Sequence, residues 1–147
     1  LMVKDPIEWV RKNWRKVSSV IIHYESVDDP INVIKLVKSK GKKIGIAINP
    51  DTKLIEIEKY LNKVNKILIM TVYPGAYGAK FQRKCLKKIK KLRKKKLRLI
   101  IQVDGAVSPK TIKKLKKAGA NEFVVGSYLQ QSINIRDSVK LLKEKIR

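Results

Sequence analysis

The residues of this sequence that could do chemistry stand where short apolar runs end. Asp104 closes the run RLIIQVD and is followed by Gly105 and Ala106. A carboxylate in that position can ligate a metal ion, act as a general acid or base, or simply cap the next turn. His23 lies near the end of another run, SSVIIHYE. Its imidazole could titrate, bind a metal ion, or lie in the core with a hydrogen-bond partner.

Small residues follow two further runs, where backbone N–H groups could face an anion. Gly126 and Ser127 end the last run, and loops after the final strands of barrel enzymes often bind phosphate. The segment PGAYG, residues 74–78, follows Val72 and is flexible enough to close over a ligand, although such a segment is more often just a turn. Met70 stands just before it, in or near the expected site, although a buried methionine usually serves packing.

These side chains need a scaffold, which the alternation of five apolar runs with amphipathic segments predicts. Asp-Pro pairs at Asp5 and Asp29 are typical helix starts, and Gly41 and Gly119 are typical helix ends. The predicted strands are 18–25, 43–49, 66–72, 98–104 and 121–127. The predicted helices open near residues 6, 30, 54, 80, 109 and 135.

The spacing of the runs is about one strand-helix unit each time, with no hairpin signals between them. This pattern predicts an α/β fold, with a parallel sheet covered by helices. Right-handed crossovers then place the carboxyl ends of all strands at one edge, where the polar residues above would gather. Two architectures fit: a small open sheet, or part of a TIM (β/α)₈ barrel, whose active site lies at that edge.

The chain has 36 Lys and Arg residues against 12 Asp and Glu, a formal net charge of +24. Such an excess suggests polyanionic partners: nucleic acid, anionic membrane or phosphorylated metabolites. The densest basic stretch is Lys80–Lys96, where Phe81, Cys85, Ile89 and Leu92 recur at helical spacing. We interpret it as a solvated outer helix rather than a nucleic-acid surface, because after Phe81 no aromatic residues interleave with the charge.

Length and cysteine content set further bounds. The 147 residues allow one domain, covering 1–147. Cys85 is the only cysteine, which excludes an intrachain disulfide and indicates a cytoplasmic setting. The longest uncharged runs have 13 residues and are too short to span a membrane.

Six motifs, in order along the whole chain, resemble the ribulose-phosphate 3-epimerase family. They are Leu1-Met2-Val3, His23-Tyr24-Glu25, GIAINPDT at 45–52, MTVYPG at 70–75, VDGAV at 103–107 and VGS at 125–127. The resemblance implies a (β/α)₈ barrel, an isomerase of the pentose phosphate pathway that interconverts ribulose 5-phosphate and xylulose 5-phosphate. It also implies a divalent metal ion (Zn, Fe, Mn or Co) and two aspartates on opposite faces of the substrate.

The resemblance further assigns site residues. Asp104 matches an aspartate that is both a metal ligand and one of two acid/base groups acting at C3 of the sugar. Met70 matches a methionine that lines the reacting centre. The residues that would hold phosphate and sugar are Gly75, Ala76, Tyr77, Gly78, Gly105, Ala106, Gly126 and Ser127. Ala106 replaces a usual glycine, and PGAYGA replaces the family's PGFGGQ.

In this family a serine, two histidines and the second aspartate precede Leu-Met-Val, where this chain begins. We therefore expect either a fragment of a full epimerase or a genuine short protein, in both cases a partial barrel whose first strands are absent and which is inactive alone. For the full-length protein we expect a homo-oligomer, a pentulose 5-phosphate substrate, and no membrane or nucleic-acid partner. Two alternatives stay open. One is a related sugar-phosphate barrel, such as an allulose-phosphate epimerase or a hexulose-phosphate synthase, and the other is a basic α/β module that binds nucleic acid.

Overall fold

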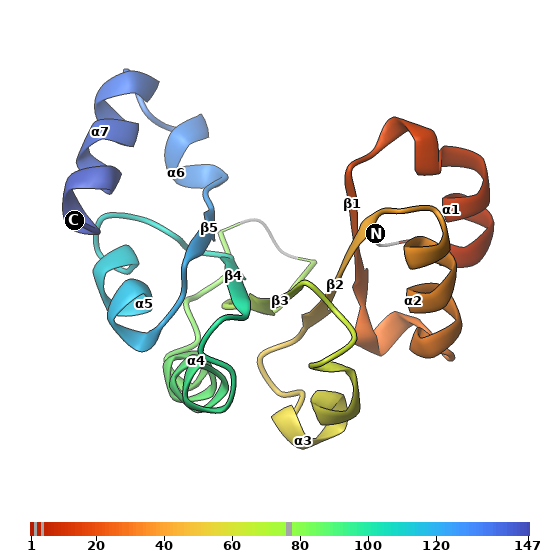
Figure 1. Cartoon of the computed structure of the whole chain (residues 1–147). Coiled ribbons are helices and arrows are strands. Elements are labelled where there is room, and N and C mark those ends of the chain that lie inside the picture. Colours follow the sequence, from red (N-terminus) through yellow and green to blue (C-terminus); the bar gives the residue numbers. More distant parts are fainter. Residues whose placement is uncertain (2, 4, 76–77) are drawn as a thin grey trace.

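The computed structural model, which describes residues 1, 3, 5–75 and 78–147, contains a five-stranded sheet (Figure 1). The strand order is β1-β2-β3-β4-β5, and every neighbouring pair is parallel. The strands are β1 (Ser19–His23), β2 (Lys43–Ile48), β3 (Lys66–Met70), β4 (Ile100–Asp104) and β5 (Glu122–Val124). The predicted parallel sheet in sequence order is confirmed. It curves, with its helices on the outside, into an open partial barrel (Figure 1).

The helices begin where the sequence places side-chain caps. The Asp5 carboxylate accepts a hydrogen bond from the Glu8 N–H at 2.8 Å, and Asp29 accepts one from the Asn32 N–H at 3.1 Å. Such caps satisfy N–H groups that have no partner within the helix. The helices are α1 (Pro6–Asn13), α2 (Pro30–Ser39), α3 (Leu54–Ile57), α4 (Lys84–Lys95), α5 (Ile112–Ala118), α6 (Ser127–Gln130) and α7 (Ile135–Lys145).

Four strands, β1, β2, β3 and β5, end earlier than the apolar runs predict. Tyr24–Ser26 forms a 3₁₀ turn after β1, and Thr71 leaves β3. Ser127, predicted as the end of the last strand, instead opens the unpredicted short helix α6. After β3 the chain stays buried at Thr71 and Val72 although the strand has ended, so hydropathy alone does not locate the strand end.

Two helices begin later than predicted. The basic helix α4 starts at Lys84 rather than Lys80, since the Gln82 N–H first donates to the Thr71 carbonyl at 2.8 Å. Helix α5 starts at Ile112 rather than near Pro109, because the Thr111 hydroxyl donates to the Ala106 carbonyl at 2.7 Å and holds a turn there. Both delays come from hydrogen bonds to the loops that follow β3 and β4.

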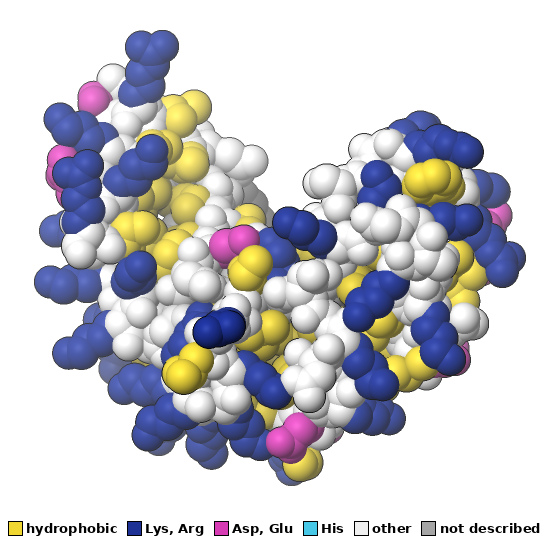
Figure 2. Space-filling view, viewed as in Figure 1, with side chains coloured by type: hydrophobic (Ala, Val, Ile, Leu, Met, Phe, Trp, Pro, Cys, Tyr) yellow, Lys and Arg dark blue, Asp and Glu magenta, His cyan; other side chains and the backbone are white. Residues whose placement is uncertain are grey.

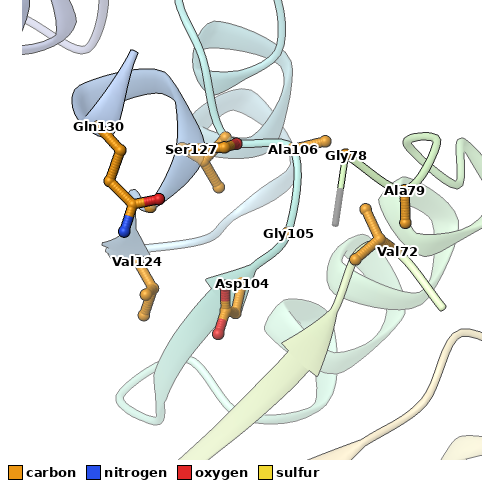
Figure 3. A pocket seen from close by; sticks show the side chains of 11 residues that line it. Val72, Gly78, Ala79, Asp104, Gly105, Ala106, Val124, Ser127 and Gln130 are labelled. Atoms are coloured by element: carbon orange, nitrogen blue, oxygen red, sulfur yellow. The ribbon is translucent and has the colours of Figure 1, made fainter. Parts of the chain in front are cut away.

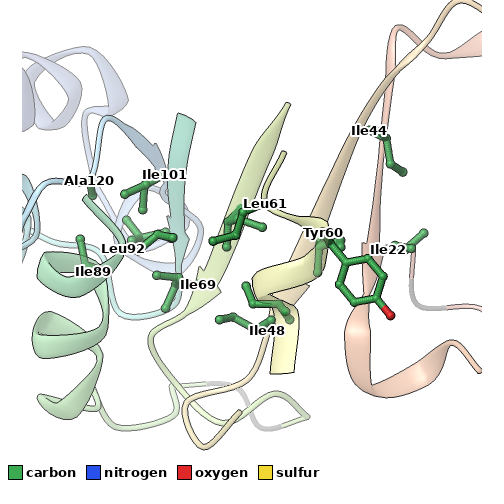
Figure 4. Packing of buried hydrophobic residues seen from close by; sticks show 14 of the residues in the cluster. Ile22, Ile44, Ile48, Tyr60, Leu61, Ile69, Ile89, Leu92, Ile101 and Ala120 are labelled. Carbon is green, nitrogen blue, oxygen red and sulfur yellow. The ribbon is translucent and has the colours of Figure 1, made fainter. Parts of the chain in front are cut away.

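The main core lies between the sheet and the outer helices (Figure 4). On α4, Cys85, Ile89 and Leu92 are fully buried, as their spacing predicts, whereas Phe81, predicted on the same face, lies before the helix and is only half-buried. They pack in one cluster with outward-facing strand residues such as Ile69 and Ile101. Burying each such aliphatic side chain contributes roughly 1.5–3 kcal/mol. The lysines of α4 are left on the outer surface, where Figure 2 shows Lys and Arg side chains in abundance.

The concave face of the sheet is different in character. It carries a small apolar cluster of Ala47, Leu68 and Met70, against which Ile21 packs. Towards the amino ends of the strands, Gln102 Nε2 donates to the Glu122 carboxylate at 3.0 Å, and Lys66 pairs with the same carboxylate. Figure 2 shows the molecule hollowed between its two ends. Within the described residues, no helix is both long and apolar enough to cross a bilayer.

Candidate functional site

A cavity of about 340 Å³ lies at the carboxyl edge of the sheet, beside the ends of β3, β4 and β5 (Figure 3). Right-handed crossovers bring these three strand ends to one edge, so loops that are distant in sequence lie next to one another around the cavity. Its lining residues are Val72, Gly78, Ala79, Asp104, Gly105, Ala106, Val107, Val124, Gly126, Ser127 and Gln130.

Most of the residues singled out in the sequence meet in this cavity. The predicted residues that line it are Gly78, Asp104, Gly105, Ala106, Gly126 and Ser127. The turns after β4 and β5 therefore line the same cavity. Gly75 and Met70 are not in the lining, although Met70 is buried and pairs in register with Asp104 on the neighbouring strand. Ala76 and Tyr77 lie outside the described residues.

The sequence did not indicate Gln130 or Val124 as site residues. Gln130 lies three residues after Ser127 on α6, and that spacing puts both on one side of a helix. Because α6 was not predicted, the helical spacing of Ser127 and Gln130 could not be recognised in the sequence. Val124 is the last residue of β5, paired with Asp104 in register, so the two side chains leave the sheet on the same face.

Asp104 is held by the buried Thr71 of the neighbouring loop. The Thr71 N–H donates to the Asp104 carbonyl at 2.7 Å, and the Thr71 hydroxyl lies 3.0 Å from that carbonyl and also contacts the Gly105 carbonyl. Burial raises the pKa of the Asp104 carboxyl, while the Gly105 N–H and His23 oppose the shift. A carboxylate with a raised pKa is a stronger base than an exposed one, which suits proton transfer.

The turn after Asp104 has an unusual backbone. Ala106 has a φ of +50°, and it is the only non-glycine residue with positive φ among those the structure describes. A side chain in this left-handed region costs roughly 1–2 kcal/mol because Cβ crowds the following carbonyl. The conformation turns the chain so that Gly105, Ala106 and Val107 all line the cavity.

Ala106→Gly is expected to raise the free energy of unfolding by about 0.5–1 kcal/mol. Relief of the left-handed strain exceeds the extra chain entropy that glycine loses on folding, roughly 0.5–1 kcal/mol. Urea unfolding at unchanged slope measures the gain. Ala79→Gly is the control, since Ala79 lines the same cavity without a positive φ and should lose stability. A lower free energy of unfolding for Ala106→Gly would contradict the presence of backbone strain at Ala106.

The described side chains include few donors for a metal ion. Among residues 1, 3, 5–75 and 78–147, no three His, Cys, Asp or Glu side chains gather closely enough to hold a metal ion. Protein sites for Zn²⁺ supply at least three such ligands in most cases. Asp104 is a single carboxylate in the cavity lining, so the described residues do not form a metal centre by themselves.

A second cavity, of about 610 Å³, lies between α3 and α4 and is lined largely by lysines. Several of these find partners in the protein itself. Lys95 Nζ lies 2.6 Å from the Glu58 carboxylate, and Lys88 Nζ donates to the Asn49 carbonyl at 2.9 Å. These contacts agree with the interpretation of α4 as an outer helix. The absence of a nucleic-acid partner stays a prediction.

Residues 1–130 match the ribulose-phosphate 3 epimerase family. The chain is 36% identical over 151 residues to the ribulose-phosphate 3-epimerase of Eremothecium gossypii, which covers 100% of this chain and 62% of the relative. It is 34% identical over 133 residues to that of Bacillus subtilis, covering 86% of this chain and 61% of the relative. The chain thus spans about three-fifths of the length of these curated relatives.

Solved structures show the same fold. The chain is similar to 3-hexulose-6-phosphate synthase with a TM-score of 0.72 and 17% identity, over 99% of this chain and 70% of that chain. It is similar to a tryptophan synthase complex from Pyrococcus furiosus with a TM-score of 0.65 and 18% identity, over 96% of this chain and 58% of that chain. At such identities the likeness concerns the fold alone. The predicted α/β class, with parallel strands and outer helices in a partial TIM barrel, is confirmed.

Proposed function

Because the chain belongs to the ribulose-phosphate 3-epimerase family, we propose that it acts within an isomerase that interconverts D-ribulose 5-phosphate and D-xylulose 5-phosphate. Its curated relatives in several organisms carry the name of that enzyme. The related hexulose-phosphate synthase has only fold likeness in its favour. A pentulose 5-phosphate is thus the substrate proposed here. Homo-oligomeric assembly of the full-length protein stays a prediction.

The convergence of two turns in one cavity carries this proposal. Gly105 and Ala106 follow β4, Gly126 and Ser127 follow β5, and all four line the same space beside Asp104. Small residues at turns let a ligand approach the backbone closely, and N–H groups at such turns favour anions. We assign the sugar phosphate group to these two turns, and the sugar chain to the space between them and Asp104.

Asp104 is the proposed proton-transfer group. The C3 proton of the substrate lies next to a carbonyl at C2, so its removal gives an enediolate rather than an isolated carbanion. The Asp104 carboxylate takes or returns that proton on one face of the substrate, helped by the burial that raises its pKa. Inversion at C3 needs a second group on the opposite face. The described cavity lining holds one carboxylate.

The family generally uses a divalent metal ion, which would polarise the C2 carbonyl. We propose Asp104 as one ligand. The described residues contain no group of three donors, so they do not hold such an ion unaided, and no step above depends on it.

Ser127→Asp is expected to weaken binding of inorganic phosphate and of ribulose 5-phosphate at least ~10-fold. The new carboxylate would stand in the cavity next to the proposed phosphate position, and like charges a few ångströms apart repel by roughly a few kcal/mol at a protein surface. Isothermal titration calorimetry measures both affinities. Asn62→Asp adds the same charge on the outer surface beside Lys96 and should change neither. If Ser127→Asp binds both ligands as tightly as the unchanged chain, the assignment of the phosphate group to these turns is wrong.

A further inference from the structure

His23 is a buried titratable group that the proposed chemistry does not use. It is the last residue of β1 and the only histidine in the chain, and it is 9% exposed. Its backbone position pairs in register with Ala47 of β2, whose side chain belongs to the concave-face cluster. Side chains at in-register positions of parallel strands leave the sheet on the same face. The His23 imidazole therefore belongs to the concave face, at the carboxyl edge.

The imidazole and the Asp104 carboxylate flank an apolar floor. Ala47 and Met70 pack with Leu68 in one buried cluster, and Met70 pairs in register with Asp104. Neighbouring strands lie about 4.8 Å apart, so β1 and β4 are about 14 Å apart along the sheet, and closer across its concave side. That span suits an extended five-carbon sugar phosphate. Electrostatic coupling between His23 and Asp104 agrees with this arrangement.

The Glu25 carboxylate lies near Nδ1 of the imidazole. One of its oxygens, Oε2, lies 4.0 Å from His23 Nδ1. The other, Oε1, accepts a hydrogen bond from the Asn49 N–H at 2.7 Å and contacts the Thr52 hydroxyl, which fixes the carboxylate to the loop after β2. A carboxylate facing Nδ1 favours the tautomer with the proton on Nδ1. Nε2, on the opposite side of the ring, is then left as a hydrogen-bond acceptor.

The protonation state of the His23 imidazole suits a hydrogen-bond acceptor. Burial lowers the pKa of His23, and this effect exceeds the opposing effect of the Glu25 and Asp104 carboxylates. A lowered pKa favours the uncharged imidazole near neutral pH. An uncharged ring can accept a hydrogen bond, whereas a protonated ring has no free lone pair.

We propose that His23 is a substrate-binding residue whose Nε2 accepts a hydrogen bond from a hydroxyl group of the sugar chain, across the apolar floor from Asp104. The inference rests on the proposed function, since it takes a polyhydroxy sugar phosphate as the ligand. This hydrogen bond distinguishes a sugar phosphate from a bare anion such as inorganic phosphate. Phosphate contacts the turns after β4 and β5, whereas only the sugar chain reaches His23.

Nitrogen NMR of the 147-residue chain tests the proposal directly, because a single histidine gives a single pair of imidazole nitrogens. Long-range proton–nitrogen spectra at neutral pH are expected to show the tautomer with the proton on Nδ1. Ribulose 5-phosphate is expected to shift the Nε2 signal, and inorganic phosphate to leave it in place. A proton on Nε2, or equal shifts with both ligands, overturns the proposal.

Binding by variants supplies the second readout. His23→Phe is expected to weaken ribulose 5-phosphate binding about 3–10-fold, the value of one hydrogen bond, with inorganic phosphate unaffected. His23→Gln, which keeps an acceptor oxygen, should restore part of the affinity. Because it is a milder change, it also serves if His23→Phe does not fold. Unchanged sugar-phosphate binding by His23→Phe overturns the proposal.

The two proposals fail in different ways. If the unchanged chain binds ribulose 5-phosphate no better than inorganic phosphate, or binds neither, the proposed function fails and the role of His23 fails with it. If the unchanged chain prefers the sugar phosphate and His23→Phe keeps the full preference, only the role of His23 is wrong.

Discussion

Asp104→Asn is expected to slow proton exchange at C3 of ribulose 5-phosphate by about 10²–10⁴-fold, the usual loss on removing a general acid or base. The protein for this test is a chimaera that joins the 147 residues to the part of the Eremothecium gossypii epimerase outside the match. The amide keeps the size of the side chain but cannot take a proton. Exchange in deuterated water, followed by NMR, measures the rate directly.

Two controls frame this result. Asp28→Asn removes an exposed carboxylate of the loop before α2 and should leave the rate unchanged. The 147-residue polypeptide alone, supplied with zinc, iron or manganese, should give no measurable epimerisation, because its described cavity lining holds one carboxylate where inversion needs two groups. Robust epimerisation by that polypeptide would show that the assignment of a single acid/base group to these residues is wrong.

Gly105→Ala is expected to lower the free energy of unfolding by about 2–5 kcal/mol and to abolish phosphate binding. Gly105 has a φ of +106°, and a Cβ at this position would lie 2.4 Å from the Val72 Cγ2 atom. The left-handed backbone costs a side chain about 1–2 kcal/mol, and the overlap with Val72 adds about 1–3 kcal/mol. Relief of the overlap would move Val72, which lines the same cavity.

Gly41→Ala is the matched control for the backbone contribution. Gly41 has a φ of +67°, and a Cβ there would meet nothing within 4 Å. Gly41→Ala should therefore lower the free energy of unfolding by about 1–2 kcal/mol, from the cost of the left-handed backbone alone. Urea unfolding of the two variants measures the difference. Equal losses would mean that close packing against Val72 adds nothing at Gly105.

The sequence by itself determined the kind of fold and the order of its strands. The caps at Asp5 and Asp29 and the buried stripe of Cys85, Ile89 and Leu92 all appear in the structure as predicted. These signals are readable because they depend on contacts between residues one to four positions apart, which the spacing of residue types records. The motifs around Asp104 also placed most of the cavity lining, because parallel strands with right-handed crossovers present their carboxyl ends at one edge.

Only the tertiary structure decided where the strands stop and what surrounds Asp104. Thr71, directly after β3, holds the Asp104 carbonyl across 33 positions of sequence. Gln130 enters the cavity through a helix that hydropathy did not reveal. His23 shares the concave face with Asp104, three strands away, because the pairings from β1 to β4 fix the register between them. Such contacts join residues far apart in the chain, and no local spacing encodes them, because loop closure and sheet curvature set those distances.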